Sequence, residues 1–314
     1  MDKEINCLLC QSSKLEITEV LQTDDIIKLW EKQHNNVRQL FNGVYSLEKY
    51  LCNNCHLEFF YPFVPGDDKF YSDLGQEEWY YLHEDKTEFS YSNKYIQDGD
   101  SVLDIGSGRG AFTKYIDKNI TYTGLDLSSK AVEYAKEENI NVLEQTIENY
   151  ADSNKETHNV VVAFQVLEHI INIDSFITSS LQVLKPNGLL ILAVPNNFNF
   201  IKDAQNHLLN LPPHHTLHWN SNSLRYIAKK FNLEIVDIYQ EELTNIHKNW
   251  YYTIKLSKII HNFLGMQIKS INMSFLTKLI NITSILFIRI FKFSFSNEKK
   301  DGMTIAITLK KRTI

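Results

Sequence analysis

Val102-Leu103-Asp104-Ile105-Gly106-Ser107-Gly108-Arg109-Gly110 places apolar residues around one acid and then a glycine at every second position. The apolar residues predict a buried parallel strand, and the glycines predict a tight turn into a helix. Glycines let the backbone approach a ligand closely, and the first turn of a helix offers unpaired N–H groups. These nine residues therefore predict a doubly wound α/β domain that holds a nucleotide-like cofactor at this turn.

The glycine spacing separates this turn from a dinucleotide-binding loop, in which the third glycine would come one residue later. Asp104, two residues before Gly106, would repel a pyrophosphate but suits the ammonium group of an amino-acid moiety. Asp126 stands twenty residues after Gly106, at the end of a β-like run, where a carboxylate can accept hydrogen bonds from both ribose hydroxyls. The combination favours S-adenosylmethionine (SAM) over a dinucleotide.

From about Ser101 to its end, the sequence resembles the class I SAM-dependent methyltransferases. Val160–Phe164 resembles the fourth strand of that family, and Gln165–His169 resembles the turn after it. Leu184–Gly188 resembles the turn before the fifth strand, with Asn187 at a left-handed position where glycine is more usual. The resemblance implies a Rossmann-like, seven-stranded, doubly wound sheet over residues 101–314.

The same resemblance implies where the cofactor lies. Asp104 and the glycine turn would hold the methionine end, and Asp126 would hold the ribose. The segment around Thr146 stands where the third strand passes the adenine, and the end of the fourth strand lies below the sulfonium. The complete predicted cofactor set is Asp104, Gly106, Ser107, Gly108, Gly110, Asp126, Leu127, Thr146, Ile147, Phe164 and Gln165.

All four cysteines fall in two Cys-x-x-Cys pairs, Cys7 with Cys10 and Cys52 with Cys55. Two such pairs can place four thiolates about 2.3 Å from one tetrahedral Zn²⁺. Two unrelated reduced pairs or a redox disulfide are the alternative, but no thioredoxin-like βαβ pattern surrounds either pair. His56 follows the last cysteine and would compete only if a thiolate were missing. A closed Cys₄ site leaves no coordination position for water, so the predicted zinc is structural.

Residues 1–66 are predicted to form a zinc-ribbon-like module with a helix capped by Thr23 and strands near 43–51 and 57–62. This front end resembles a subgroup of bacterial methyltransferases associated with surface-polysaccharide or small-molecule biosynthesis. Residues 67–100 form an aromatic linker, which the resemblance places over the cofactor pocket as lid helices. Tyr80 and Tyr81 are its candidate contacts to cofactor or substrate.

Residues 243–297 form an insertion with seven Lys or Arg residues and neither Asp nor Glu. Apolar residues at spacings of three or four, from Ile268 to Phe293, predict a helical stripe. We expect this stripe to pack on its own domain or on a partner chain, for example in a homodimer. The alternative is that residues 245–297 lie as a basic amphipathic helix on an anionic membrane.

Length and charge limit the remaining functions. The 314 residues suffice for one large α/β domain and a small second module, and the net charge of −6 gives no general attraction to nucleic acid. The polar start, Met1–Asn6, has no apolar signal core, and no run of about 18 uncharged apolar residues occurs. We expect a cytoplasmic protein, peripheral to the inner membrane face only if the insertion binds lipid.

Methyl transfer from a sulfonium is an in-line displacement, so catalysis is mostly positioning, but a hydroxyl acceptor also needs a base. His169, His214 and His215 are the predicted bases, with His218 as a further candidate. The alternative for His169 is a hydrogen bond that fixes its own turn. The His-His-x-x-His spacing at 214–218 also fits a second metal, which is disfavoured because no carboxylate stands nearby in sequence.

The leading hypothesis is therefore a SAM-dependent methyltransferase that acts on a small-molecule acceptor. The resemblance favours a hydroxyl of a sugar, nucleotide-sugar or surface-glycan precursor. An RNA methyltransferase is the weaker alternative, because residues 1–66 hold more acids than bases, and no nucleic-acid partner is expected. A sugar C-methyltransferase would carry a further C-terminal domain. A non-catalytic SAM-binding scaffold subunit is the remaining alternative.

Overall fold

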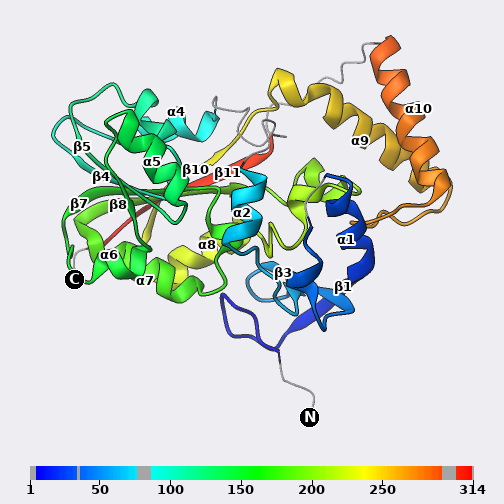
Figure 1. Ribbon diagram of the computed structural model, residues 1–314, viewed down its shortest axis with the longest axis horizontal. Helices are drawn as coiled ribbons and strands as arrows, with labels where there is room; N and C mark the ends of the chain where they lie inside the picture. Colours follow the sequence, from blue (N-terminus) through cyan, green and yellow to red (C-terminus); the bar gives the residue numbers. More distant parts are fainter. Residues whose placement is uncertain (1–4, 34–35, 76–85, 292–301, 313–314) are drawn as a thin grey trace.

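The computed structural model describes residues 5–33, 36–75, 86–291 and 302–312 (Figure 1). Its larger sheet has seven strands, which confirms the predicted Rossmann-like class. In chain order they are β4 (Ser101–Ile105), β5 (Thr121–Asp126), β6 (Val142–Glu144), β7 (His158–Phe164), β8 (Leu184–Pro195), β10 (Glu234–Gln240) and β11 (Thr304–Lys310). Their spatial order is β10-β11-β8-β7-β4-β5-β6, and β11 runs antiparallel to both of its neighbours. The strands β4 to β8 are mutually parallel.

Alternate residues of these strands pack against helices on opposite faces of the sheet. One face is covered by α6 (Ile147–Ala151), α7 (Ile173–Val183) and α8 (Ser221–Lys230), which meet Leu103 and Val161. The other face is covered by α4 (Thr87–Asn93) and the 3₁₀ helix η2 (Ala111–Tyr115), which meet Val102 and Val160. Because neighbouring residues of a strand point to opposite faces, both sides of the central strands are apolar, as a parallel sheet requires.

Helix starts and turns follow local chemistry. Ser128 caps α5 (Ser129–Glu137) by accepting a hydrogen bond from the Ala131 amide. Asn187 has a φ of +62°, as expected of a residue that replaces glycine. Thr23 is not a cap: it is the first residue of α1 (Thr23–Glu31), and the preceding Gln22 makes no side-chain capping bond.

The N-terminal segment forms a second, antiparallel sheet in the order β1-β2-β3-β9. The predicted strands are β2 (Ser46–Cys52) and β3 (Glu58–Tyr61), whereas β1 (Leu15–Gln22) has no counterpart in the sequence prediction. The fourth strand, β9 (Leu217–His218), comes from the loop between β8 and α8 and pairs with β3. This small sheet therefore extends beyond residue 66 and takes one strand from the larger domain.

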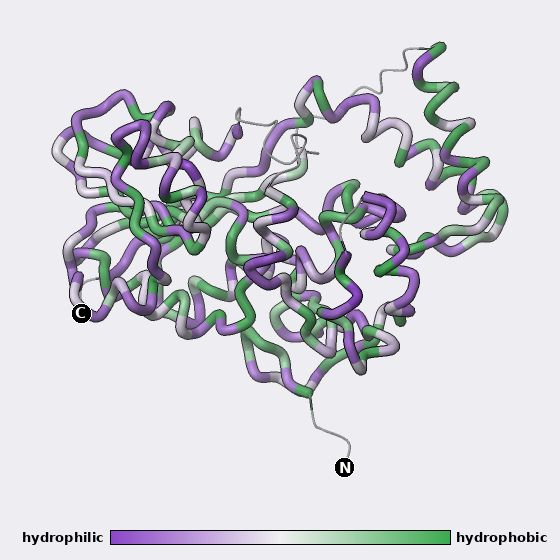
Figure 2. Tube along the Cα trace, in the orientation of Figure 1, coloured by the Kyte–Doolittle hydropathy of each residue, from purple (hydrophilic) through white to green (hydrophobic). Residues whose placement is uncertain are grey.

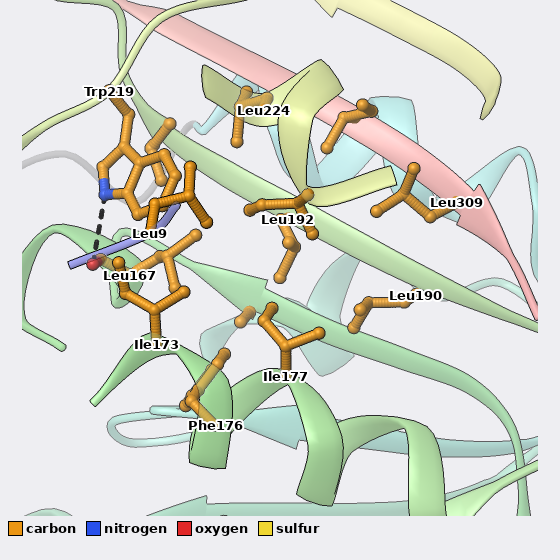
Figure 3. Close-up of a cluster of buried hydrophobic side chains, with 14 of the residues drawn as sticks. Leu9, Leu167, Ile173, Phe176, Ile177, Leu190, Leu192, Trp219, Leu224 and Leu309 are labelled. Atoms are coloured by element: carbon orange, nitrogen blue, oxygen red, sulfur yellow. Dashed lines mark hydrogen bonds between the residues drawn. The ribbon is translucent and has the colours of Figure 1, made fainter. Parts of the chain in front are cut away.

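Trp219 joins the two parts (Figure 3). Its ring is fully buried beside Leu9 of the first cysteine pair, and its indole Nε1 donates to the carbonyl of Leu167 at 3.2 Å. The ammonium of Lys230 donates to the Leu9 carbonyl at 2.7 Å, and the Asn220 side chain donates to the His56 carbonyl at 2.5 Å. The cysteine pairs thus share one hydrophobic core with the large sheet.

The aromatic linker contributes α2 (Asp68–Leu74) and α4, while the candidates Tyr80 and Tyr81 lie outside the described residues. The insertion forms α9 (Asn245–Phe263) and α10 (Phe275–Phe291), a helical hairpin at one end of the molecule (Figure 1). The predicted apolar stripe of α10 does not pack on its own domain: Leu279, Ile282 and Leu286 are 46%, 54% and 52% exposed. Within the described ranges, no helix combines the length and the apolar character needed to cross a membrane.

Candidate functional site

The glycine turn after β4 requires its glycines. Gly106, Gly108 and Gly110 have φ values of +70°, +55° and +75°, which L side chains rarely adopt. A Cβ on Gly106 would lie 2.4 Å from Cγ2 of Val166, and one on Gly110 would lie 2.7 Å from Cγ2 of Ile140. A Cβ on Gly108 would face open space. The turn is therefore packed at both ends and open at its middle, where a ligand can approach the backbone.

Asp104 is prepared for a cation. Its side chain is buried, Oδ2 accepts a hydrogen bond from the Tyr122 hydroxyl at 2.8 Å, and Oδ1 has no partner among the described residues. Burial raises the pKa of this carboxyl from 3.8 to about 7, because desolvation penalises the charged form. An ammonium group beside Oδ1 would supply the missing partner and favour the carboxylate, so the site fits the methionine end of SAM.

Asp126 holds the turn together. Its Oδ2 accepts from the Gly108 amide and its Oδ1 from the Ser128 amide, both at 2.8 Å. Each carboxylate oxygen keeps a second lone pair, which is what two ribose hydroxyls need. Leu127 follows and is 63% exposed.

Three further predicted cofactor residues have different surroundings. Ser107 turns its hydroxyl toward Gly124, and Thr146 caps α6 by accepting from the Asn149 amide at 3.2 Å. Ile147 is buried in the core, so only its backbone is open to an adenine.

The side chains at the end of β7 contact other parts of the protein. The ring of Phe164 packs against Phe89 and Phe112, each with a centroid distance of 4.9 Å. Gln165 has a φ of +57° and donates through Nε2 to the buried Glu88 at 3.1 Å. The backbone of this turn, more than its side chains, is therefore available to a ligand.

Three of the four histidine candidates lie together. β4 and β7 are adjacent and parallel, so the 3₁₀ helix η3 (Leu167–His169) begins at the same sheet edge as the glycine turn. The loop that follows β8 brings His214 and His215 to His169. One ring nitrogen from each of the three lies within 4.8 Å of the others. His218 lies in β9 and is not in this group. Its Nε2 contacts the Asn210 carbonyl at 2.9 Å.

Each of the three rings is oriented through its Nδ1 atom. In His169 this atom lies 2.6 Å from the His214 carbonyl, and in His214 it lies 2.9 Å from the Leu209 carbonyl. In His215 it lies 3.4 Å from Oδ1 of Asn210. A carbonyl oxygen only accepts, so in His214 and His215 these contacts place the proton on Nδ1 and leave the lone pair on Nε2. The ring of His169 also faces the Gln165 carbonyl.

Burial keeps the histidines neutral. It lowers the pKa of His169 to about 4 and lowers the pKa of His214 and His215 well below the ordinary value. A base works best when its pKa lies near the operating pH, so these rings are weak proton acceptors. Burial also raises the pKa of Glu168, next to His169, to about 8.

The N-terminal module holds the histidine loop. Trp30 donates through Nε1 to the Pro212 carbonyl at 3.1 Å, and the Gly66 amide donates to the Pro213 carbonyl at 2.9 Å. From α2, the Tyr71 hydroxyl lies 3.1 Å from Nδ1 of His169. The linker helix α2 therefore contacts the cluster through Tyr71. Its predicted place over the cofactor pocket stays a prediction.

The four cysteines gather into one site. Cys7 and Cys55 have Sγ atoms 3.4 Å apart, as do Cys10 and Cys52, and all four Sγ atoms lie within 4.8 Å of one another. A backbone hydrogen bond closes the turn of each pair. The Gln11 amide donates to the Cys7 carbonyl and the His56 amide to the Cys52 carbonyl, both at 2.9 Å. A tetrahedron with Zn–S bonds of about 2.3 Å has edges of about 3.8 Å, so the donor set fits zinc.

Sequence reasoning missed several residues of this region. Tyr71 and Glu88 bond predicted site residues from distant parts of the chain. Asn210 lies only five residues before its partner His215, but nothing in its type or spacing marks it. Only Glu168 carried a signal, because it precedes His169 directly.

Comparison with known proteins places the chain in a family. A family model described as "Methyltransferase domain" matches residues 76–238. The ubiquinone biosynthesis O-methyltransferase of Rickettsia canadensis is 36% identical over 102 residues, which are 30% of this chain and 42% of that protein. The enzyme of that name from Vibrio parahaemolyticus is 26% identical over 48% of this chain and 68% of its own length. The chain thus spans less than half of the first of these relatives.

A solved structure has a similar fold. A SAM-dependent methyltransferase from Archaeoglobus fulgidus superposes with a TM-score of 0.50 at 18% identity, over 75% of this chain and all of that one. Since the family model spans more than half of the sequence, the chain belongs to the methyltransferase domain family, and its α/β fold is that of the solved structure.

Proposed function

We propose that the protein transfers a methyl group from SAM to a hydroxyl of a small-molecule acceptor, in particular a sugar, nucleotide-sugar or surface-glycan precursor. One observation carries this proposal. The open cradle at Gly108 and the unpartnered oxygen of Asp104 lie at the same sheet edge as the three-histidine group. A cofactor in the first would direct its methyl toward an acceptor held at the second.

Each part of the site then has a role. Asp104 pairs with the ammonium group, the Gly106–Gly110 backbone follows the methionine chain, and Asp126 receives the ribose hydroxyls. The histidines orient the acceptor, and Tyr71 helps to exclude water from them. Because methyl transfer is an in-line displacement, positioning supplies most of the rate enhancement.

We further propose that the Cys₄ group holds a structural Zn²⁺. Four thiolates leave no open coordination position. Leu9, which lies between Cys7 and Cys10, packs beside Trp219 in the shared core. The metal would stabilise the sheet that holds the histidine loop. Reduced cysteine pairs of this kind fit a cytoplasmic location.

A phenolic hydroxyl is a second candidate acceptor. The relatives from Rickettsia and Vibrio are named for O-methylation in ubiquinone biosynthesis. The low identity and partial coverage leave the acceptor of this chain as a proposal.

The test is formation of S-adenosylhomocysteine by the full, zinc-loaded chain. One panel holds UDP- and dTDP-sugars, and a second holds catechols such as 3,4-dihydroxybenzoate. Acceptor-dependent product that disappears in Asp104→Asn supports the proposal, and the active panel identifies the acceptor class. Saturable SAM binding without product in either panel would favour the scaffold alternative.

A further inference from the structure

We propose that His169, His214, His215 and Glu168 form a second metal site, for a divalent first-row transition ion. The inference deepens the proposed function, on which its catalytic part rests. It differs from the Cys₄ group in its donors and in its place at the cofactor edge of the sheet.

The donors converge in the folded chain. One nitrogen from each of the three imidazoles lies within 4.8 Å of the others, and Oε1 of Glu168 lies 3.8 Å from Nε2 of His215. Glu168 is completely buried, and neither of its carboxylate oxygens has a hydrogen-bond partner among the described residues. A buried carboxyl group without a hydrogen-bond partner is costly, and a bound cation would both pair with it and favour its carboxylate form.

The surroundings resemble those of metal-binding histidines. Such rings usually donate their other nitrogen to a carbonyl or carboxylate, which fixes the tautomer. Here the Nδ1 atoms of His169 and His214 contact backbone carbonyls, and that of His215 faces Oδ1 of Asn210. Neutral imidazole with one carboxylate is a donor set for Zn²⁺, Fe²⁺, Mn²⁺ or Co²⁺.

Such an ion would do what these weakly basic rings do not. An acceptor hydroxyl that binds the ion loses its proton to water, because the cation lowers the pKa of the bound oxygen. The alkoxide oxygen then forms a bond to the SAM methyl carbon. The carbon–sulfur bond breaks, and its electron pair remains on sulfur as S-adenosylhomocysteine.

Metal content distinguishes the two sites. Full-length protein is dialysed against Zn²⁺, Mn²⁺, Fe²⁺ or Co²⁺ singly, and bound metal is counted by plasma mass spectrometry. Wild type is expected to hold one more ion per chain than His215→Ala, and Glu168→Gln to bind that ion at least about tenfold more weakly. With Co²⁺, the thiolate charge-transfer band is expected to remain in His215→Ala, which loses the histidine-bound ion. The band is expected to disappear in Cys7→Ser, which loses the thiolate-bound ion.

His56→Asn is the matched control and is expected to keep both ions. Circular dichroism and SAM calorimetry on each variant confirm folding and an intact cofactor site. If wild type and His215→Ala hold equal metal with every cation, the site does not exist, even where methyl transfer proceeds. Anomalous scattering from metal-soaked wild-type crystals tests the same site without any variant: a peak between the three imidazoles is expected, and its absence with every cation overturns the proposal.

A second observation is independent of the site. We infer that the α9–α10 hairpin docks on an anionic lipid surface. Polar groups lie between its helices beside buried Ile254, Ile280 and Ile288. The Ser257 hydroxyl contacts Oδ1 of Asn281 at 2.7 Å, and Nε2 of His261 contacts Oγ1 of Thr277 at 3.2 Å. Ser284 is also buried on this side of α10. Small polar residues between helices, with apolar residues outside, are typical of helices that face lipid.

The outer side of the hairpin is apolar and basic, and Figure 2 shows hydrophobic residues along α10. The exposed apolar side chains include Phe263, Phe275, Leu276, Leu279, Ile282, Leu286 and Ile290. Lys248, Lys269, Lys278 and Arg289 are exposed on the same two helices and their connection, and residues 243–297 contain no acid. Charge of one sign around an apolar face complements an anionic bilayer.

Vesicle co-sedimentation tests this surface. Full-length protein is mixed with phosphatidylcholine vesicles, with or without phosphatidylglycerol. Binding is expected to need the anionic lipid, to vanish in Leu279→Ser/Leu286→Ser/Ile290→Ser, and to weaken about fivefold for each of Lys278→Glu and Arg289→Glu. Ile17→Ser/Val20→Ser, which changes exposed apolar residues of β1, is the control and should bind normally. Equal sedimentation of all variants overturns the inference, as does a homodimer by light scattering that the triple variant loses and that binds no vesicles.

Discussion

Oε1 of Glu168 lies 3.8 Å from Nε2 of His215, although 47 positions separate the two residues in the sequence. The contact joins the turn after β7 to the loop after β8. That loop is held from the other side by the N-terminal module, through Trp30 and Gly66. The N-terminal module therefore supports the candidate site, because it fixes the loop that carries His214 and His215.

Asp104→Asn should weaken SAM binding by roughly 10- to 100-fold, because a charge-assisted hydrogen bond contributes about 1.5–3 kcal/mol. The substitution keeps the bond from Tyr122 and removes the charge opposite the ammonium. Calorimetric titration with SAM measures the change. Asp152→Asn, an exposed carboxylate after α6, is the control and should bind SAM as wild type does. Equal affinity of both variants would remove Asp104 from the site.

SAM affinity should rise with pH and level off near pH 7. Burial raises the pKa of Asp104 from 3.8 to about 7, so in the free protein its stabilising contribution is greatest at low pH and is lost as pH rises through 7. The SAM ammonium favours the carboxylate, so binding below pH 7 releases a proton. Calorimetry in two buffers of different ionisation enthalpy detects that release at about pH 6. Asp104→Asn should release none, and a wild type without proton release would contradict this assignment.

Gly108→Ala and Gly110→Ala should separate ligand binding from stability. Both place a side chain at positive φ, which costs about 1 kcal/mol. At Gly110 the new Cβ also overlaps Cγ2 of Ile140 at 2.7 Å, so the free energy of unfolding should fall by about 2–3 kcal/mol. At Gly108 the methyl enters the space left for the cofactor, and SAM affinity should fall instead. Urea denaturation and calorimetry measure the two effects, and the reverse order would contradict the open cradle.

Cys52→Ser should remove one metal ion per chain and lower the melting temperature by roughly 5 °C or more, since ligation contributes to folding of the small sheet. Metal analysis and thermal denaturation of the full chain measure both quantities. His56→Asn changes the neighbouring knuckle without touching a thiolate and should keep the ion. Retention of all metal by Cys52→Ser would show that the cysteines do not hold zinc.

The sequence predicts what depends on local order along the chain. The glycine turn, the parallel strands on either side of it and the two cysteine pairs are each encoded in a short stretch, and the structure places them as predicted for the fold. Asn187 is of this kind, because a left-handed position selects its own residue types.

Most of the remaining features depend on contacts between residues that are distant in the sequence. β9 has two residues, too few to show periodicity, and exists because β3 pairs with it. Glu168 is far from His214 in the sequence, so proximity along the chain does not identify it as a ligand, whereas the fold brings it close. The stripe of α10 is periodic as predicted, but periodicity does not say whether protein or solvent faces it. The cap predicted at Thr23 is wrong by one position, since Gln22 occupies the cap without a side-chain bond.

The central claim is that the turn from Asp104 to Gly110, with Asp126, binds SAM. Calorimetric titration of SAM into the folded, zinc-loaded full chain at pH 7.5 tests it most directly. We predict saturable binding of one SAM per chain in the micromolar range. A titration without binding heat up to millimolar SAM, confirmed by equilibrium dialysis, would contradict the account.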